Sequence, residues 1–474
     1  MPSRRSLLGI ALMVGPLVAS ALLSQASATD TWRGGGGTAD WSNAANWAAN
    51  AVPASGDKLI FPASTNLTSY DDLSGSAFSG VTFSAAGYDI GGDALTLSGP
   101  LAVTAAVTSG QDEIDQPVTF AEGGRVSVAT GGVVLDLAAT PVGAVVKTGH
   151  GTLAAQGLNA GTSPITVRAG ILTGCGSGAS STSPITVDAG ASYLAGSPGS
   201  SGDLISCLRP LVVQGTGYQG DGAIDVVQHV DFGSLSLGSD ATIGGATTGG
   251  TSSSYWLGAV AVRGHTLTAA GDTNTFAGSV SGSGRILQEA SDITLVEGTG
   301  SLGSAVASSG MLGLAVPVTT VTVGGVGVLY TASSISRLSV SASAELWPCD
   351  VPTTAPPTGP DTPTVTTVGH SLRLPGGTTF VAQLGVGSAA GNDSLSVTSG
   401  VLTIGHASLE VAAPGACDGS GIATQSGDSY TVLTAPSGLV GTFAGLPNGA
   451  VLIGEDGNPY RVTYTTTSVV LTRN

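Results

Sequence analysis

Short apolar runs recur along the whole chain after residue 30, and glycine, serine, threonine or aspartate separates one run from the next. Within many runs apolar and polar residues alternate, as in Leu395-Ser396-Val397. This alternation places the apolar side chains on one face of a β-strand, and no segment shows the apolar stripe and caps of a helix. The pattern predicts an all-β protein of many short strands, which include Lys58–Phe61, Ala94–Leu97, Val133–Leu137, Ile165–Val167, Leu211–Val213, Ile293–Val296, Leu402–Ile404 and Leu409–Val411.

An internal repeat indicates how these strands are arranged. Thr162–Gly170 recurs as Thr182–Gly190, and eight of the nine positions are identical. A period of about 20 residues is typical of a solenoid, whose coils stack because a single β-coil cannot bury its apolar face. Stacking would place Ile165 about 4.8 Å from Ile185. We predict an elongated right-handed parallel β-helix (a β-solenoid) with an N-terminal cap; a local duplication within a β-sandwich is the alternative.

The composition agrees with a β-solenoid and excludes other classes of protein. Glycine is 74 of 474 residues, charged residues are 9 % and mean hydropathy is +0.34. Collagen is excluded because glycine has no period of three, and a coiled coil because its characteristic composition is missing. A charge-rich disordered chain is excluded because the hydropathy is too high.

The segment 1–28 has the pattern of an export signal. Arg4 and Arg5 precede an apolar run over Ser6–Leu23, and Ala26-Ser27-Ala28 offers a small-residue cleavage site. We expect cleavage after Ala28 and a mature protein that is secreted or at the cell surface, without a membrane segment of its own. An uncleaved anchor is the alternative, and a partial twin-arginine match leaves the export route open.

Composition divides the remaining chain into four parts. We expect a tryptophan-rich cap at 29–62, a β-solenoid at 63–347, a proline-rich loop at 348–364, and C-terminal solenoid coils with a cap at 365–474. The loop is assigned because proline cannot donate a hydrogen bond to a strand ladder. Its six prolines are Pro348, Pro352, Pro356, Pro357, Pro360 and Pro363.

Three of the five tryptophans, Trp32, Trp41 and Trp47, lie close together in the predicted cap. If exposed, their rings could stack on sugars, as in a carbohydrate-binding module. If buried, they would close the open end of the β-helix and hide its edge from other chains. Their place at the start of the solenoid favours the cap.

Four cysteines without a C-x-x-C motif suit two disulfide bonds in an exported protein. We pair Cys175 with Cys207, because their separation fits one coil of the repeat plus a Gly/Ser-rich insertion. We pair Cys349 with Cys417, and the other two connectivities stay open. Each bridge would contribute roughly 2–4 kcal/mol.

Asp112, Glu113 and Asp115 form the densest acidic cluster. In β-helical polysaccharide lyases carboxylates hold calcium beside a basic proton acceptor, and inverting hydrolases use two facing carboxylates. On a strand Asp112 and Glu113 would point to opposite faces, whereas Pro117 indicates a loop. Because no arginine or lysine is near in sequence, we interpret the cluster as a solvated turn.

Other catalytic and binding motifs are weak. His229-Val230-Asp231 could place histidine and aspartate on one strand face, but no G-x-S-x-G motif supplies a nucleophile. Gly427-Asp428-Ser429 lacks the glycine that follows this motif in serine proteases. Two segments, Gly215–Gly220 and Gly298–Gly303, match the dinucleotide-binding motif G-x-G-x-x-G, but this number of matches is expected by chance at this glycine content. No two histidines have metal-binding spacing. We therefore predict no catalytic, metal or cofactor site.

Three regions resemble autotransporter-associated β-strand-repeat proteins, which are secreted parallel β-helical passengers. The first region is the block from Trp32 to Phe61. The second is Lys147–Leu153 followed by Ala169–Leu172, which is similar to the family's K-x-G-x-G-x-L repeat and the strand after it. The third consists of the C-terminal segments Asp393–Val397, Gly427–Leu433 and Gly441–Pro447. The resemblance implies a β-helix and a surface or secreted role, and it implies no reaction. True autotransporters end in a membrane barrel. Here the repeat-like strands run to the last residues, so we expect export by the N-terminal signal.

The net charge is −17, and Lys58 and Lys147 are the only lysines. Nucleic acid and anionic lipid are therefore poor partners, and extracellular or cell-surface glycans or proteins are the partners we expect. Together these features predict a secreted structural or adhesive β-solenoid that presents an extended binding surface and has no catalytic activity. A polysaccharide-active β-helix enzyme (lyase or hydrolase) and a carbohydrate-binding module are the alternatives.

Overall fold

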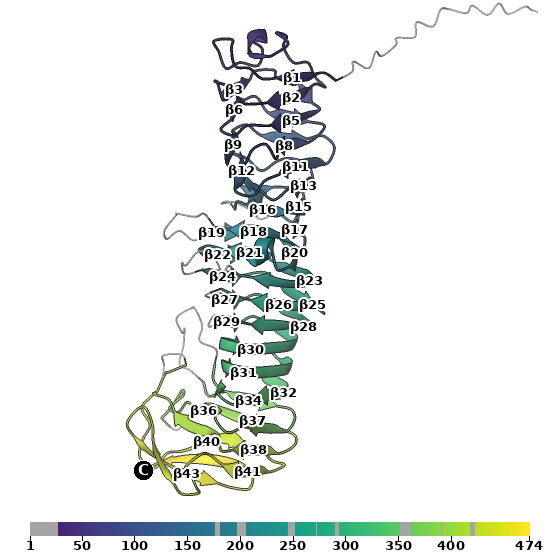
Figure 1. Cartoon of the computed structure of the whole chain (residues 1–474). Helices are drawn as coiled ribbons and strands as arrows, with labels where there is room; N and C mark the ends of the chain where they lie inside the picture. Colours follow the sequence, from purple (N-terminus) through teal and green to yellow (C-terminus); the bar gives the residue numbers. More distant parts are fainter. Residues whose placement is uncertain are drawn as a thin grey trace, which may run out of the picture.

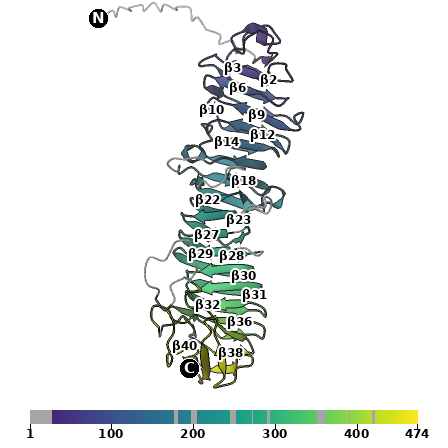
Figure 2. The same cartoon turned by 90° about the vertical axis from the view of Figure 1, so that its left-hand side faces the viewer.

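The computed structural model describes residues 27–175, 181–196, 205–244, 252–271, 273–289, 293–350, 362–389, 391–417 and 422–474. Over these ranges the chain forms stacked parallel β-coils, and its helices are three short 3-10 turns: Ala44–Asn46, Leu158–Ala160 and Tyr218–Gly220. Figures 1 and 2 show one long body, and Figure 1 places β1 near one end and β43 near the other. The predicted all-β solenoid is confirmed. Residues 1–26 of the predicted signal peptide and 351–361 of the predicted loop lie outside the described residues.

The longest ladder runs along the whole body, and each of its strands pairs in parallel with the next. Its strands are β1 (Thr29–Thr31), β2 (Lys58–Phe61), β5 (Gly80–Phe83), β8 (Leu101–Val103), β11 (Gly124–Val128), β13 (Val145–Thr148), β15 (Ile165–Val167), β17 (Ile185–Val187), β20 (Leu211–Gly215), β23 (Leu235–Ile243), β25 (Val260–Arg263), β28 (Val280–Gln288), β30 (Gly300–Leu314), β31 (Val318–Thr331), β32 (Ser334–Val340), β34 (Val365–Val368), β37 (Ser394–Val397) and β40 (Ser429–Thr434).

Two further parallel ladders form the other sides of the coils. The second contains β3 (Thr68–Asp71), β6 (Asp89–Gly92), β9 (Gly110–Ile114), β12 (Val133–Leu137), β14 (Thr152–Ala155), β16 (Gly170–Thr173), β18 (Ala191–Ala195), β21 (Ile224–Val226) and β26 (Thr266–Ala269). The third contains β19 (Ile205–Cys207), β22 (His229–Phe232), β24 (Ser253–Trp256), β27 (Thr273–Phe276), β29 (Ile293–Val296), β33 (Glu345–Trp347), β36 (Thr379–Ala382) and β39 (Ser408–Val411). The long strand β30 connects all three ladders. It pairs with β28 at its start and with β29 at its end, and the second half of β28 also pairs with β26 of the second ladder.

Shorter sheets complete the body. Two three-stranded parallel sheets consist of β4 (Ala77–Phe78), β7 (Leu95–Leu97) and β10 (Val118–Phe120), and of β35 (Leu372–Leu374), β38 (Leu402–Gly405) and β41 (Leu439–Thr442). At the C-terminal end, antiparallel pairing replaces parallel stacking in β42 (Val451–Ile453), β43 (Pro459–Tyr464) and β44 (Ser468–Arg473). The change in direction closes this end of the ladder on β40.

The internal repeat stacks as predicted. Ile165 pairs with Ile185 and Val167 with Val187, and all four side chains are buried. Coil length varies elsewhere, as the number of residues between two paired positions on successive coils shows. The coil from Leu302 to its partner Val318 is less than half as long as the coil from Leu395 to its partner Leu433. Insertions at the corners therefore hide the period in the sequence, while the strands of successive coils still pair in parallel.

The predicted tryptophan cap is confirmed by burial. Trp32, Trp41 and Trp47 are at most 1 % exposed, and Trp47 lies between the other two at ring-centroid distances of 5.3 and 6.0 Å. Phe61 of the second coil contacts all three rings. The indole N–H of Trp47 donates to the Trp41 carbonyl at 2.8 Å. No ring face is left for a sugar, so the carbohydrate-binding alternative based on these tryptophans is not supported.

The K-x-G-x-G segment has a structural explanation. The Nζ atom of Lys147 is buried and donates to the carbonyls of Gly149 at 2.6 Å, Ala169 at 2.7 Å, and Gly151. A β-carbon at Gly170 would lie 2.5 Å from this Nζ atom and from two of those carbonyl oxygens. Burial lowers the pKa of Lys147 to about 7. The lysine thus fastens the corners of two successive coils, and glycine is required where its ammonium group approaches the backbone.

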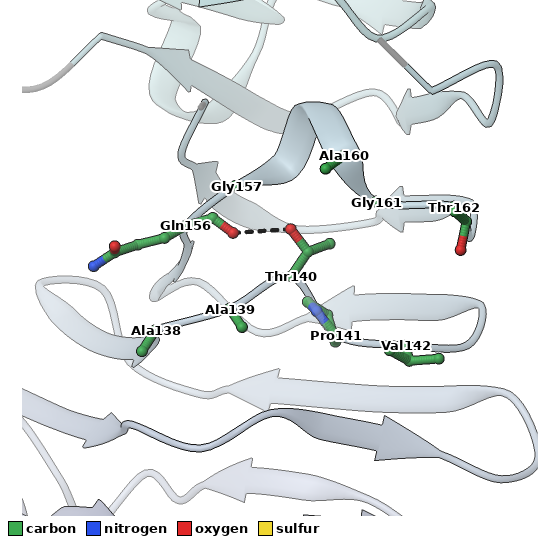
Figure 3. A pocket seen from close by; sticks show the side chains of 10 residues that line it. All are labelled: Ala138, Ala139, Thr140, Pro141, Val142, Gln156, Gly157, Ala160, Gly161 and Thr162. Atoms are coloured by element: carbon green, nitrogen blue, oxygen red, sulfur yellow. Dashed lines mark hydrogen bonds between the residues drawn. The ribbon is translucent and has the colours of Figure 1, made fainter. Parts of the chain in front are cut away.

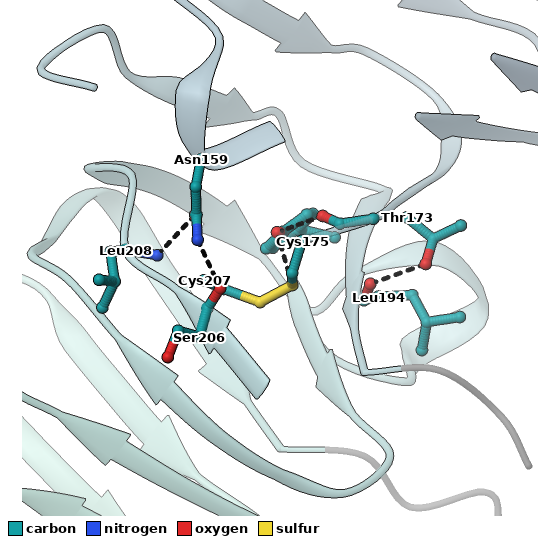
Figure 4. The surroundings of a disulfide bond; sticks show 9 residues. Asn159, Thr173, Cys175, Leu194, Ser206, Cys207 and Leu208 are labelled. Carbon is teal, nitrogen blue, oxygen red and sulfur yellow. Dashed lines mark hydrogen bonds between the residues drawn. A yellow bond between two sulfur atoms is a disulfide. The ribbon is translucent and has the colours of Figure 1, made fainter. Parts of the chain in front are cut away.

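Both predicted disulfides are present, Cys175–Cys207 and Cys349–Cys417. Figure 4 shows the first, next to Asn159, whose side chain donates to the Ser206 carbonyl at 2.6 Å and accepts from the Leu208 amide at 2.8 Å. Each bridge has a cysteine just after a strand, at a corner of the coil where ladder hydrogen bonds end. The pairs are compatible with an extracellular protein.

Candidate functional site

Two residues of the acidic cluster, Asp112 and Glu113, lie on strand β9, which corrects the prediction of a solvated turn; Asp115 directly follows the strand. Asp112 is fully buried on the inner face of β9, and its Oδ1 atom accepts from the Tyr88 amide at 3.1 Å. Burial raises the pKa of Asp112 to about 6. Glu113 points outward, so the two carboxyl groups do not share a groove, and the predicted alternation of faces is confirmed.

A row of outward carboxylates crosses three coils at this point. Asp89, Glu113 and Asp136 are in-register neighbours on β6, β9 and β12. Partial burial, followed by the charges of Asp115 and Asp136, raises the pKa of Glu113. Over the described ranges, no three His, Cys, Asp or Glu side chains are placed to hold a metal ion. The row therefore lacks the arrangement that the polysaccharide-lyase alternative needs.

The clearest candidate site is a cleft on the outer face of β22, β24 and β27, which we call the His229 cleft. Its volume is about 510 Å³, and its lining consists of His229, Asp231, Ser253, Ser254, Tyr255, Thr273 and Thr275. Three coils contribute to it because the strands stack in register: His229 pairs with Ser253, and Ser253 pairs with Thr273.

Three polar side chains meet at the cleft. The Nδ1 atom of His229 is hydrogen-bonded to the Ser253 hydroxyl, and its Nε2 atom lies 3.9 Å from Asp231 Oδ1. The His229 side chain is 53 % exposed and that of Asp231 only 17 %. The sequence correctly predicted His229 and Asp231 on one face, but Ser253 was missed. Its register with His229 depends on a coil whose length the sequence does not reveal.

A rigid aromatic stack supports the floor of the cleft from inside. The rings of Phe232 and Trp256 stack with centroids 4.3 Å apart and an interplanar angle of 12°, and Phe276 continues the stack. The Trp256 indole donates to the Ser254 hydroxyl at 3.0 Å, and that hydroxyl donates to Asn274 Oδ1 at 2.7 Å. The inner faces of all three strands are therefore fixed by packing and hydrogen bonds, which holds the outward side chains in place.

A second groove, of about 490 Å³, lies between the corners after β12 and β14 (Figure 3). Its lining is small or weakly polar: Ala138, Ala139, Thr140, Pro141, Val142, Gln156, Gly157, Ala160, Gly161 and Thr162. The Thr140 hydroxyl is committed to the Gln156 carbonyl at 2.8 Å. This lining contains no charged side chain, so the groove offers no chemistry comparable to that of the His229 cleft.

The remaining motifs serve local structure. In the Gly427-Asp428-Ser429 segment, the carboxylate of Asp428 accepts from the Tyr430 hydroxyl at 3.2 Å, and the Ser429 hydroxyl is hydrogen-bonded to Thr472. Of the two G-x-G-x-x-G matches, one ends in the 3-10 turn Tyr218–Gly220 and the other enters β30. Neither begins a helix that could hold a dinucleotide phosphate.

No family model, no curated protein and no solved structure matches this chain. Among the described residues, no helix is long and apolar enough to cross a membrane. The resemblance to autotransporter-associated repeats therefore stays a prediction.

Proposed function

We propose that the protein is an exported structural or adhesive solenoid of the autotransporter-associated repeat type, which binds an extracellular polymer along its outer face. The observation that carries this proposal is the division of each strand into two faces. Aliphatic and aromatic side chains fill the inside of the coils. The outward positions of the longest ladder include stacked hydroxyl side chains, such as Thr166 beside Thr186 and Ser281 beside Ser301.

The chemistry of these outer faces favours an uncharged polysaccharide as the partner. Only 9 % of the residues are charged, and the excess is negative, so the surface repels anionic polymers and offers few charges for cationic ones. Hydroxyl groups that recur along a rod can donate to and accept from sugar hydroxyls at several positions. The summed contacts would give useful affinity even where each one is weak.

One observation supports the export part of the proposal: the paired cysteines suit an oxidising compartment. Cleavage after Ala28 would leave Thr29, the first residue of β1, as the mature N-terminus. The Lys147 corner also gives the K-x-G-x-G-x-L segment a physical role in fastening successive coils.

A glycan array probed with the mature protein at low and high salt tests the proposal. We expect binding to at least one neutral polysaccharide, retained at high salt because few charges take part, with no release of reducing ends. Binding that salt abolishes, binding to proteins alone, or depolymerisation of the bound glycan would contradict it. N-terminal sequencing of the exported protein tests the export part separately, with Thr29 as the expected first residue.

A further inference from the structure

We propose that Ser253, His229 and Asp231 form a hydrolytic site for small carboxylic esters. This inference does not depend on the binding role proposed above. The serine hydroxyl contacts one ring nitrogen of His229, and the carboxylate of Asp231 faces the other at 3.9 Å. A nucleophile, a base and a carboxylate close enough to stabilise the protonated base are groups that acyl transfer can use, and they are recognised by geometry rather than by sequence order.

The exposure of the three groups suits these roles. Asp231 is mostly buried, so its charge is poorly screened where it faces the ring. His229 is half exposed, so a substrate in the cleft can reach the Ser253 hydroxyl beside it. The serine begins β24 and the histidine begins β22, and the buried Phe232–Trp256 stack below holds both strands in register.

The reaction balances without a further reagent. Ser253 Oγ attacks the ester carbonyl carbon while its proton passes to Nδ1 of His229, and Asp231 stabilises the resulting imidazolium. The C–O bond to the alcohol then breaks, and the alcohol leaves with that proton. Water attacks the acyl-serine and gives one proton to Nδ1; the acid is released as the proton returns to Ser253 Oγ.

The next coil supplies a donor for the developing oxyanion. Thr273 pairs in register with Ser253, so its side chain lies about 4.8 Å further along the same wall. Its side chain lines the cleft, and a threonine hydroxyl can rotate to donate toward an ester oxygen there. The cleft of about 510 Å³ is open to solvent, and several hydroxyl side chains line it, which suits a short acyl group on a larger alcohol such as a sugar.

Labelling with a fluorophosphonate probe tests the proposal on the mature protein. We expect one covalent adduct on Ser253, located by peptide mass spectrometry, and slow hydrolysis of 4-nitrophenyl acetate. Ser253→Ala should abolish both, and His229→Gln should slow labelling by at least about 100-fold, as loss of a general base does. Asp231→Asn should also slow it.

A matched control is available in the same molecule. His265 lies 3.8 Å from Asp240, a similar pair outside the cleft, so His265→Gln should label at the wild-type rate. Circular dichroism and thermal melting of each variant show whether it is folded. The proposal is overturned if folded wild-type protein gives no Ser253 adduct, or if His229→Gln labels as fast as the control.

Discussion

Asp112 allows the energetic cost of a buried carboxyl group in this solenoid to be measured. Its Oδ2 atom is buried without a hydrogen-bond partner among the described residues, while Oδ1 accepts a backbone N–H from the previous coil. Its pKa rises from 3.8 to about 6 on folding, chiefly through desolvation. The folded protein therefore binds this proton more tightly than the unfolded chain does.

The sign of the pH dependence follows from linkage. Well below pH 3.8 the carboxyl group is neutral in both states, so folding buries no charge there. As pH rises from 3.8 to about 6, the unfolded chain loses its proton first, so the free energy of unfolding falls. A pKa shift of about two units corresponds to about 3 kcal/mol once the pH exceeds the folded-state pKa.

Asp112→Asn should remove this penalty. The amide keeps the Oδ1 acceptor but brings an N–H₂ group that also lacks a partner, so we expect a gain of about 2 kcal/mol at pH 8 and no more than about 0.5 kcal/mol at pH 3.5. Urea unfolding of both proteins at several pH values measures the difference. Glu122→Gln, on an exposed bend, is the control and should change little at any pH.

An equal gap between Asp112→Asn and wild type at pH 3.5 and pH 8 would refute this linkage. A variant that is less stable than wild type at pH 8 would refute it equally.

Three further predictions test the fold. Cys349→Ser should lower the free energy of unfolding by roughly 2–4 kcal/mol without reductant, and added reductant should erase the difference from wild type. Gly170→Ala should destabilise strongly, because its β-carbon would meet the Lys147 corner; Gly190→Ala, at the same repeat position with open space around it, should cost only about 1 kcal/mol. Trp47→Ala should cost about 3–5 kcal/mol and raise binding of a hydrophobic dye, because it opens the N-terminal core.

The sequence predicted those features that depend on local pattern. The shared residues of the repeat placed Ile165 over Ile185, and spacing alone paired Cys175 with Cys207. These predictions succeed because strand alternation is a local rule and coil stacking joins each coil only to its nearest neighbours.

Features that depend on coil length or on burial were missed. Ser253 contacts His229 because the coil that separates them is long enough to bring both residues into register. The length of a coil varies too widely along this chain to be predicted from the sequence. Asp112 was expected in water because an unpaired carboxylate is rarely fully buried. In the structure, a backbone N–H of the neighbouring coil and a raised pKa make its burial tolerable. Neither the contact between Ser253 and His229 nor the hydrogen bond to Asp112 leaves a signal in the local sequence.

Small-angle X-ray scattering of the mature protein tests the central claim, the stacked rod, most directly. A rung spacing of about 4.8 Å along the ladder from β1 to β40 gives a body about 80 Å long before side chains and caps are added. We predict a skewed, rod-like distance distribution that extends to about 100 Å. A symmetric distribution with a radius of gyration of about 22 Å, as expected for a globule of this length, would contradict the account.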